Sequence, residues 1–303
     1  MPDPALMLHA AYNPGMLLNS ENATASRLRN VDMHCHSTVS DGVLAPAAVA
    51  ARAKANGVAL WALTDHDELS GIPEARAAAA ALDLPYVPGV EISVTWAGQT
   101  VHIVGLQIDE TSAELAGGLQ ATRSGRERRA REMSAQLAAA GIPGAYEGAL
   151  KFVGNPDLIG RTHFARYIME LGICPDVNSV FKRYLIDGKP GFVPHRWATL
   201  GESVRWIKAA GGVAVVAHPG RYKLGPLAHQ EFFEAFKDLG GTAIEVLTGS
   251  HTVDQYAVYA KLAKQYGFEV SQGSDFHGPG ESRLDLGTLP TCPEGLVPVW
   301  RDW

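Results

Sequence analysis

The chain has 303 residues, of which 46% are hydrophobic and 19% are charged, and its formal net charge at pH 7 is −6. This composition is ordinary for a globular protein, and the length allows one large α/β domain or a barrel that carries a smaller insertion. Because the net charge is negative, we expect no broad basic surface for duplex DNA. A small or single-stranded phosphorylated substrate would need only a local positive pocket.

The cysteines and the lack of long apolar runs indicate the cellular compartment of the protein. Cys35, Cys174 and Cys292 lie far apart and form no CxxC pair, which favours a reduced, cytoplasmic location. No apolar run approaches the roughly 20 residues that span a bilayer, so we expect no membrane association. Residues 1–29 lack the pattern of a signal peptide. We expect them to form a flexible N-terminal arm, or to result from a start codon assigned too early.

From residue 31 onward, short β-branched or apolar runs alternate with Ala-rich stretches of helical pattern, which is typical of α/β architecture with a largely parallel sheet. The predicted strands are 31–36, 59–64, 86–94, 101–108, 213–217, 243–247 and 268–273. The predicted helices around them are 46–56, 71–82, 201–210, 228–239 and 253–267. The short link at 96–99 favours a hairpin between the third and fourth strands. Seven strands with intervening helices predict a barrel that is distorted or incomplete.

Between about 110 and 200 this alternation stops, and the pattern becomes helical. The predicted helices here are 114–140, 161–171 and 177–184, and they are separated by short segments rich in Gly and Pro. We therefore expect residues 110–200 to form a helical subdomain that is inserted into a barrel made of residues 30–109 and 201–303.

The first predicted strand contains His34 and His36, which are two residues apart. Alternate side chains of a strand share a face, so the two imidazoles point together and Cys35 points away. Such a pair can converge on one metal ion at the end of the strand. Taken alone, however, it is explained as well by two hydrogen-bonded histidines near the surface.

Five of the other six predicted strands change that balance, because each supplies further histidine or carboxylate groups. Glu91 and His102 lie inside apolar strands, where an unpaired carboxylate is costly to bury. Groups at strand ends or in adjacent turns are Asp41, Asp65, His66, His218, Asp275 and His277. Each has a structural explanation on its own, such as a capped turn or a core position. The strands of a barrel gather functional groups at one rim. Taken together, these residues therefore predict a metal centre at that rim. Mixed imidazole and carboxylate ligands favour Mn, Zn or Fe over Ca or Mg alone.

The ordered series His34-x-His36, Thr64-Asp65-His66, Glu91, His102, His218-Pro219 and Asp275-x-His277 resembles the PHP family (polymerase and histidinol phosphatase). This resemblance implies a distorted seven-stranded (β/α) barrel that binds two or three divalent cations, Mn foremost, with Zn, Fe or Mg as alternatives. It implies a first metal held by His34, His36, Glu91 and Asp275, and a second held by Glu91, His102 and His218. A third would be held by Asp41, His66 and His277. Some relatives have histidine where this chain has Asp41, which leaves the occupancy of the third site open.

Cationic residues in and after the helical part are candidates for binding phosphate. Arginine forks match phosphate oxygens and lysine supplies a mobile charge, so we expect Arg161, Lys189 and Arg221 to bind the substrate phosphate. The glycines that flank Lys189 would allow close approach of the backbone to a ligand. By contrast, the arginine run at 123–131 is interleaved with glutamates, which is typical of a solvated helix face.

Three strings sharpen the resemblance: Arg161-Thr162-His163, Gly188-Lys189-Pro190-Gly191 and Ala217-His218-Pro219-Gly220-Arg221. They are similar to a PHP subgroup that removes the 3′-phosphate from 3′,5′-bisphosphonucleosides and trims short RNA as a 5′→3′ exoribonuclease (the ribonuclease AM type). We accordingly expect a small phosphorylated nucleotide or short single-stranded RNA as the substrate. His163 and His195 are candidates for contacting phosphate or protonating the leaving group, and Asp65 for orienting His66 or a bound water.

Alternative functions remain open on the sequence alone. One is another metal hydrolase, either a histidinol-phosphate or other small-molecule phosphatase or an amidohydrolase that cleaves C–N bonds. Glu91 as the bridging group and the Asp275-x-His277 pair favour phosphoesters over the amidohydrolase. The other is a catalytically idle metal-binding module, which the complete ligand set disfavours. The sequence predicts no oligomeric state.

Overall fold

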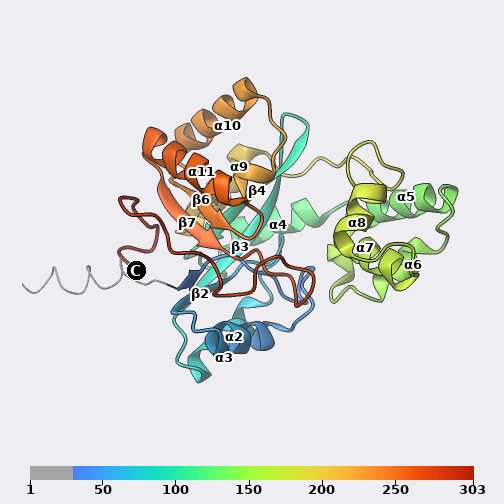
Figure 1. Cartoon of the computed structure of the whole chain (residues 1–303), viewed down its shortest axis with the longest axis horizontal. Coiled ribbons are helices and arrows are strands. Elements are labelled where there is room, and N and C mark those ends of the chain that lie inside the picture. Colours follow the sequence, from blue (N-terminus) through green and yellow to red (C-terminus); the bar gives the residue numbers. More distant parts are fainter. Residues whose placement is uncertain (1–29) are drawn as a thin grey trace, which may run out of the picture.

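The structure, a computed structural model, describes residues 30–303, and the predicted arm at 1–29 lies outside the described residues. Within residues 30–303, no helix is both long and apolar enough to cross a membrane. Figure 1 shows a barrel with helices on two sides and a group of further helices, α5 to α8, beside it.

Seven strands form one sheet in sequence order, and the sheet curls until its two edges meet. Neighbouring strands are parallel except at β4, which is antiparallel to both β3 and β5. The edges are joined where Met33 N donates to Gln272 O (2.9 Å) and where Cys35 pairs with Phe276. The strands are β1 (Val31–Asp32), β2 (Leu60–Leu63), β3 (Tyr86–Trp96), β4 (Gln99–Leu106), β5 (Val213–Val216), β6 (Ala243–Thr248) and β7 (Glu269–Gly273). The predicted distorted seven-stranded barrel and its hairpin are confirmed.

One strand is much shorter than predicted. The expected strand 31–36 is regular only over Val31–Asp32, after which the chain keeps a single isolated bridge at Cys35. The backbone leaves the regular ladder where His34 and His36 turn towards the other polar side chains at this end of the barrel.

Five helices cover the outside of the barrel, and all begin and end within two residues of the prediction. They are α2 (Pro46–Ala55), α3 (Ile72–Ala81), α9 (Leu200–Ala209), α10 (Pro226–Asp238) and α11 (Val253–Tyr266). Proline in the first turn begins α2, α3 and α10, where its missing N–H is not needed. Thr199 with Glu202, and Thr252 with Gln255, form capping boxes that begin α9 and α11.

The middle of the chain is helical, as expected, but its first predicted helix is wrong. Residues 114–140 form two helices, α4 (Ala113–Arg123) and α5 (Arg126–Ala139), because Gly125 between them has φ +87°. Regular elements that follow are α6 (Ala145–Leu150), η2 (Pro156–Leu158), α7 (Arg161–Glu170), α8 (Val177–Val180) and the π-helical turn η3 (Phe181–Leu185).

Hydrophobic packing divides this middle part unequally. Leu115 and Leu119 of α4 belong to the same buried cluster as the barrel strands. A separate cluster, which includes Met133 and Phe164, joins α5 to α8 and involves only residues between 130 and 193. The independent core is therefore smaller than the expected 110–200, and the division into two domains stays a prediction.

Helix α4 packs closely on α9 through Gly118. A Cβ at Gly118 would overlap the ring of Trp206, whereas a Cβ at the neighbouring Gly117 would meet nothing within 4 Å. We expect Gly118→Ala to lower the free energy of unfolding by about 1–3 kcal/mol through overpacking. Gly117→Ala, the matched control, should raise it by about 0.5–1 kcal/mol through helix propensity. Urea unfolding of both variants checks this, and equal effects would contradict the packing described.

Candidate active site

All nine residues predicted as metal ligands lie together at one end of the barrel. The strands and the loops that follow them deliver His34, His36, Asp41, His66, Glu91, His102, His218, Asp275 and His277. We call these nine side chains the metal-ligand cluster. Two of them come from inside strands, as expected: Glu91 is in the middle of β3, and His102 is in the first half of β4, opposite Ser93. Because β4 is antiparallel, its first half reaches the same end of the barrel.

The first group of the cluster consists of His34, His36, Glu91 and Asp275. His34 Nε2 lies 3.2 Å from both His36 Nε2 and Glu91 Oε2. Asp275 Oδ1 lies 3.7 Å from His34 Nε2 and 3.4 Å from His36 Nε2. Ligands held about 2.0–2.2 Å from one ion in tetrahedral geometry are about 3.3–3.6 Å apart. His34, His36 and Asp275 therefore have about the spacing that one cation requires, and Glu91 Oε2 lies beside the two imidazole nitrogens.

The second group uses the other oxygen of the same glutamate. Glu91 Oε1 lies 2.9 Å from His102 Nδ1 and 2.9 Å from His218 Nε2, and these two nitrogens are 3.4 Å apart. Glu91 thus stands between two groups, with one carboxylate oxygen facing each. That is the arrangement needed for a carboxylate that bridges two cations.

The third group is more open than the other two. Asp41 Oδ1 lies 3.4 Å from His277 Nε2 and 3.9 Å from His66 Nε2. Its other oxygen, Oδ2, accepts a hydrogen bond of 2.8 Å from Thr162 Oγ1 on α7. The helical part of the chain therefore holds one member of this group in place.

The electrostatics of the cluster fit bound cations. Glu91 is fully buried, and its Oε2 makes no hydrogen bond of acceptable geometry to any residue from 30 to 303. Burial alone would raise the pKa of Glu91, but the histidines around it, His66 and His102 foremost, hold that pKa well below its usual range. A buried ionised carboxylate that faces several imidazole nitrogens is in the environment expected of a metal ligand.

A further acid, Glu245 of β6, was missed in the sequence. Its Oε1 lies 2.7 Å from His34 Nδ1, and its Oε2 accepts a 2.6 Å hydrogen bond from His218 N. When the neutral ring of His34 donates from Nδ1 to Glu245, its Nε2 atom is unprotonated and faces the cluster, as a metal ligand requires. The available signal was an acid inside an apolar strand, the same signal that identified Glu91.

The backbone is strained on both sides of the cluster. His218 has φ 28° and Asp275 has φ 55°, values that residues other than glycine rarely adopt. Such conformations persist only where the surrounding contacts impose them, and they concentrate at functional sites. Here the strain lies in two residues that carry cluster groups.

The Asp65 carboxylate accepts hydrogen bonds from the loop that follows β1. Its Oδ1 accepts hydrogen bonds from Ser37 N (2.8 Å) and Ser40 Oγ (2.5 Å), and its Oδ2 accepts from Ser37 Oγ (2.7 Å). These bonds do not include His66, so the orientation of His66 or a bound water by Asp65 stays a prediction. The carboxylate fixes the loop that carries Asp41.

The two expected acid–base histidines are also placed differently. His163 is fully buried, its Nδ1 accepts from Gly160 N (3.0 Å) at the start of α7, and burial lowers its pKa to about 4. His195 packs edge-on against Trp197, and burial together with Arg129 lowers its pKa to about 4. Neither histidine lines a cavity beside the cluster. Their contact with phosphate or a leaving group therefore stays a prediction, without support from their position in the structure.

Two of the three expected phosphate-binding residues lie at the cluster. Arg161 and Arg221 both line a cavity that also contains cluster residues, and Arg221 Nη1 lies 3.2 Å from Asp275 Oδ2. Lys189 is exposed and lines neither of the two cavities at the cluster, so its role in binding phosphate stays a prediction. Of the glycines beside it, Gly191 is needed for packing, since a Cβ there would crowd Leu137.

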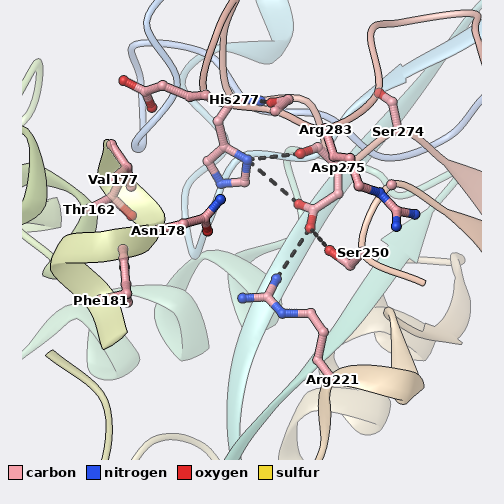
Figure 2. Close-up of a pocket in the computed structure, with 13 residues that line it drawn as sticks. Thr162, Val177, Asn178, Phe181, Arg221, Ser250, Ser274, Asp275, His277 and Arg283 are labelled. Carbon is pink, nitrogen blue, oxygen red and sulfur yellow. Dashed lines mark hydrogen bonds and ion pairs between the residues drawn. The ribbon is translucent and has the colours of Figure 1, made fainter. Parts of the chain in front are cut away.

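Among residues 30–303, two cavities that adjoin the cluster stand out. The larger, of about 450 Å³, lies where Arg221, Ser250 and Asn178 face Asp275 and His277 (Figure 2). The smaller, of about 110 Å³, lies on the side of α5 and α7. Both are lined in part by the same four residues: Thr162, Phe181, Arg221 and His277.

The expectation of a solvated arginine run holds for only part of α5. Arg128 and Arg131 are exposed and pair with Glu132 and Glu127. Arg126 and Arg129, however, are buried and line the smaller cavity. They share a face with buried Ala130, Met133 and Leu137, so the helical period of the apolar residues was the signal that could have identified them.

Comparison with known proteins supports the assignment of the fold. The PHP domain profile matches residues 32–150 of this chain. The chain is 48% identical to the 3′,5′-nucleoside bisphosphate phosphatase of Chromobacterium violaceum, over 91% of this chain and 96% of that protein. It is 40% identical to a 5′-3′ exoribonuclease of Haemophilus influenzae, over 90% of this chain and 98% of that protein. A solved structure from Bifidobacterium adolescentis, assigned as a metal-dependent phosphoesterase, has a TM-score of 0.76 at 26% identity and covers 90% of this chain and 94% of that one.

These similarities extend over nearly all of the described chain and agree with its seven-stranded barrel and its metal-ligand cluster. The two relatives at 48% and 40% identity are named as enzymes that break phosphate ester bonds. The chain therefore belongs to the PHP family and is a metal-dependent phosphoester hydrolase.

Proposed function

We propose that this enzyme removes the 3′-phosphate from 3′,5′-bisphosphonucleosides and also shortens RNA from a 5′-phosphorylated end. The observation that carries this proposal is the metal-ligand cluster with Arg161 and Arg221 beside it, which joins a hydrolytic centre to groups that recognise phosphate. The names of the relatives at 48% and 40% identity support the choice of these two substrates.

The same kind of bond, P–O3′, is broken in both substrates. In a bisphosphonucleoside, water attacks the 3′-phosphorus and the P–O3′ bond breaks, which releases inorganic phosphate and a 3′-hydroxyl. In RNA, the same cleavage after the first nucleotide releases a 5′-mononucleotide and leaves a 5′-phosphate on the shortened chain. The product is thus a substrate for the next round, so a single site can perform both reactions.

The cluster would hold two or three cations, and we propose Mn as the physiological metal because the donors are mixed imidazole and carboxylate. When bound, such cations polarise phosphoryl oxygens and lower the pKa of water. The protein itself orients the side chains that would hold these cations. Glu245 fixes the ring of His34, and Thr162 fixes Asp41.

Arg221 is the cationic side chain best placed to bind the phosphate that is cleaved. It contacts Asp275 of the first group, its side chain is 48% exposed, and it lines both cavities. A guanidinium in this position can neutralise charge on the phosphoryl oxygens and hold the phosphorus in line for attack.

A cytoplasmic location is part of this proposal. Cys35, Cys174 and Cys292 are all free thiols, as expected for a protein kept in a reducing environment. The proposed nucleotide and RNA substrates are also intracellular molecules.

The substrate proposal is tested by a Mn-supplemented assay with four compounds: 3′,5′-bisphosphoadenosine, adenosine 5′-monophosphate, histidinol phosphate and a 5′-phosphorylated oligoribonucleotide. We expect phosphate release from the bisphosphate, mononucleotide release from the RNA, and no hydrolysis of the 5′-monophosphate. Fastest turnover of histidinol phosphate would favour that alternative. Full metal loading without turnover of any compound would favour an idle metal-binding module.

Glu91→Gln tests the bridging carboxylate. The amide removes the charge that faces two groups of the cluster, so we expect kcat/KM to fall about 1,000-fold or more and metal content to drop. Metal analysis and circular dichroism should show lost metal in a folded protein. Glu231→Gln, at an exposed position on α10, is the control and should change neither quantity. Full metal content with wild-type turnover in Glu91→Gln would refute the assignment.

Glu245→Gln tests the residue that orients His34. Loss of a carboxylate behind a metal-binding histidine typically weakens metal affinity by about 10–100-fold. We expect Mn affinity, measured by titration with electron paramagnetic resonance detection, to fall in this range while the circular dichroism spectrum is unchanged. Unaltered affinity would mean that Glu245 has a structural role alone.

A further inference from the structure

The two cavities at the metal-ligand cluster share part of their lining, including Arg221 and His277, so a substrate bound at the cluster can extend into both. The phosphate that is cleaved has two sides. One side carries O3′ of the nucleotide that is released. On the other side RNA continues into the next nucleotide, whereas a bisphosphonucleoside ends there. One cavity is therefore expected to face the released nucleotide, and the other to receive the remaining RNA chain.

The two cavities differ in how they open to solvent. The lining of the smaller cavity is buried or half-buried, apart from the shared Arg221. The larger cavity, of about 450 Å³, has two further exposed residues in its lining, Asn178 and Arg283 (Figure 2). The remaining RNA chain must reach solvent whatever its length, so the larger cavity is the route that suits it. Its volume is also in the range of cavities that hold small organic ligands.

Arg283 supplies positive charge at the exposed edge of the larger cavity. It donates from Nη2 to His251 O, and among residues 30–303 it pairs with no carboxylate. Glu281, an acid in the same lining, is paired with Arg166 through contacts of 2.9 and 2.7 Å. The Nε and Nη1 atoms of Arg283 make no hydrogen bond within that part of the chain. They can therefore donate to a phosphate oxygen of a ligand.

His251 holds Arg283 in a fixed relation to Arg221. The His251 ring is fully buried, its Nδ1 donates to Val246 O (3.0 Å), and its Nε2 accepts from Gly220 N (2.9 Å). Gly220 precedes Arg221, and a Cβ at Gly220 would lie 2.8 Å from the His251 ring, which is too close. One buried residue thus contacts the backbone beside Arg221 with its ring and accepts a hydrogen bond from Arg283 with its carbonyl oxygen.

A series of contacts connects the cluster with Arg283 along the wall of the larger cavity. Asp275 Oδ2 accepts from Ser250 Oγ (2.7 Å) and from Arg221 Nη1 (3.2 Å), as Figure 2 shows. Ser250 adjoins His251, which accepts from Arg283. Arg221 therefore lies at the proposed cations, and Arg283 lies further along the same wall.

We propose that Arg283 binds the phosphodiester that follows the cleaved phosphate in RNA, and that the larger cavity holds the nucleotide between these two phosphates. This inference rests on the proposed function, in which RNA is a substrate. A phosphodiester carries one negative charge, which a single exposed guanidinium matches without the cost of a buried ion pair. Bisphosphonucleosides have no phosphate at this position. Arg283 is thus a residue that determines specificity for RNA and has no part in the hydrolysis of mononucleotides.

Steady-state kinetics of the Mn-loaded enzyme test this proposal with 3′,5′-bisphosphoadenosine, a 5′-phosphorylated diribonucleotide and a 5′-phosphorylated triribonucleotide. Only the trinucleotide has a phosphodiester after the one that is cleaved first. We therefore expect Arg283→Met to lower kcat/KM for the first cleavage of the trinucleotide about 10-fold, and to leave the other two substrates at their wild-type values. Arg283→Lys, which keeps the charge, should lose less. Equal losses on all three substrates, or no loss on the trinucleotide, would overturn the proposal.

Arg205→Met is the matched control. It removes an exposed arginine of α9 that lines neither cavity at the cluster, so we expect wild-type kcat/KM on all three substrates. The same loss on the trinucleotide in Arg205→Met and Arg283→Met would show that net charge, and not the position of Arg283, sets the rate. That result would also overturn the proposal.

Salt dependence gives a readout that a purely structural role of Arg283 would not change. Each phosphate contact with a single strand contributes about 0.7 to the slope of log affinity against log salt concentration. In Arg283→Met, the slope of log kcat/KM for the trinucleotide should therefore become shallower by about 0.7. An unchanged slope would contradict a phosphate contact by Arg283.

Binding measurements separate this inference from the proposed function. A trinucleotide in which a methylene group replaces O3′ of the first linkage cannot be cleaved there. Calorimetry with the Mn-loaded enzyme should show that Arg283→Met weakens its binding about 10-fold. If this loss occurs while the wild-type enzyme hydrolyses none of the substrates, the role of Arg283 stands and the proposed function fails. If the wild-type enzyme hydrolyses RNA and Arg283→Met binds and cleaves it equally well, the proposed function stands and the role of Arg283 fails.

Discussion

The buried carboxylate of Glu91 is the constraint on which the site depends. One of its oxygens faces His34 and His36, and the other faces His102 and His218. A carboxylate inside an apolar strand is costly to bury unless positive charge surrounds it. Burial of Glu91 in β3 therefore depends on the imidazoles around it. The buried position of Glu91, with one oxygen facing each group, is unfavourable for folding. The same position allows Glu91 to bridge two cation sites.

The reversed strand of the barrel shapes the surroundings of this carboxylate. Because β4 is antiparallel, it brings His102 to the cluster from its first half, and the β3–β4 hairpin continues beyond the cluster to Trp96 and Gln99. The chain that returns from the helical part runs along this extension, where Thr95 N donates to Ala198 O (2.9 Å). That contact places Trp197 against Arg126 and Arg129. A single hairpin thus supports both the metal-ligand cluster and the buried arginines of α5.

Much of this architecture could be predicted from the sequence because its signals are local. Alternation of apolar runs identified seven strands and the helices around the barrel, and polar residues in or after the strands gave the candidate ligands. The resemblance to the PHP family then selected the nine residues of the cluster. Glu245 gave the same signal as Glu91 but lacked a neighbouring motif that would have drawn attention to it. Arg126 and Arg129 could not be recognised from the charge pattern, since their burial depends on how α5 packs against a barrel that is distant in sequence. The contacts of Asp65 with Ser37 and Ser40 are likewise non-local, whereas the contact of His163 with Gly160 is local to the start of α7.

The most direct test of the bridging role of Glu91 is anomalous X-ray diffraction from crystals grown with Mn. The structure predicts one anomalous peak on each side of the Glu91 carboxylate, the first among His34, His36 and Asp275 and the second between His102 and His218. Peaks at both positions would establish Glu91 as a bridge between two cations. A single peak, or peaks away from Glu91, would contradict that role.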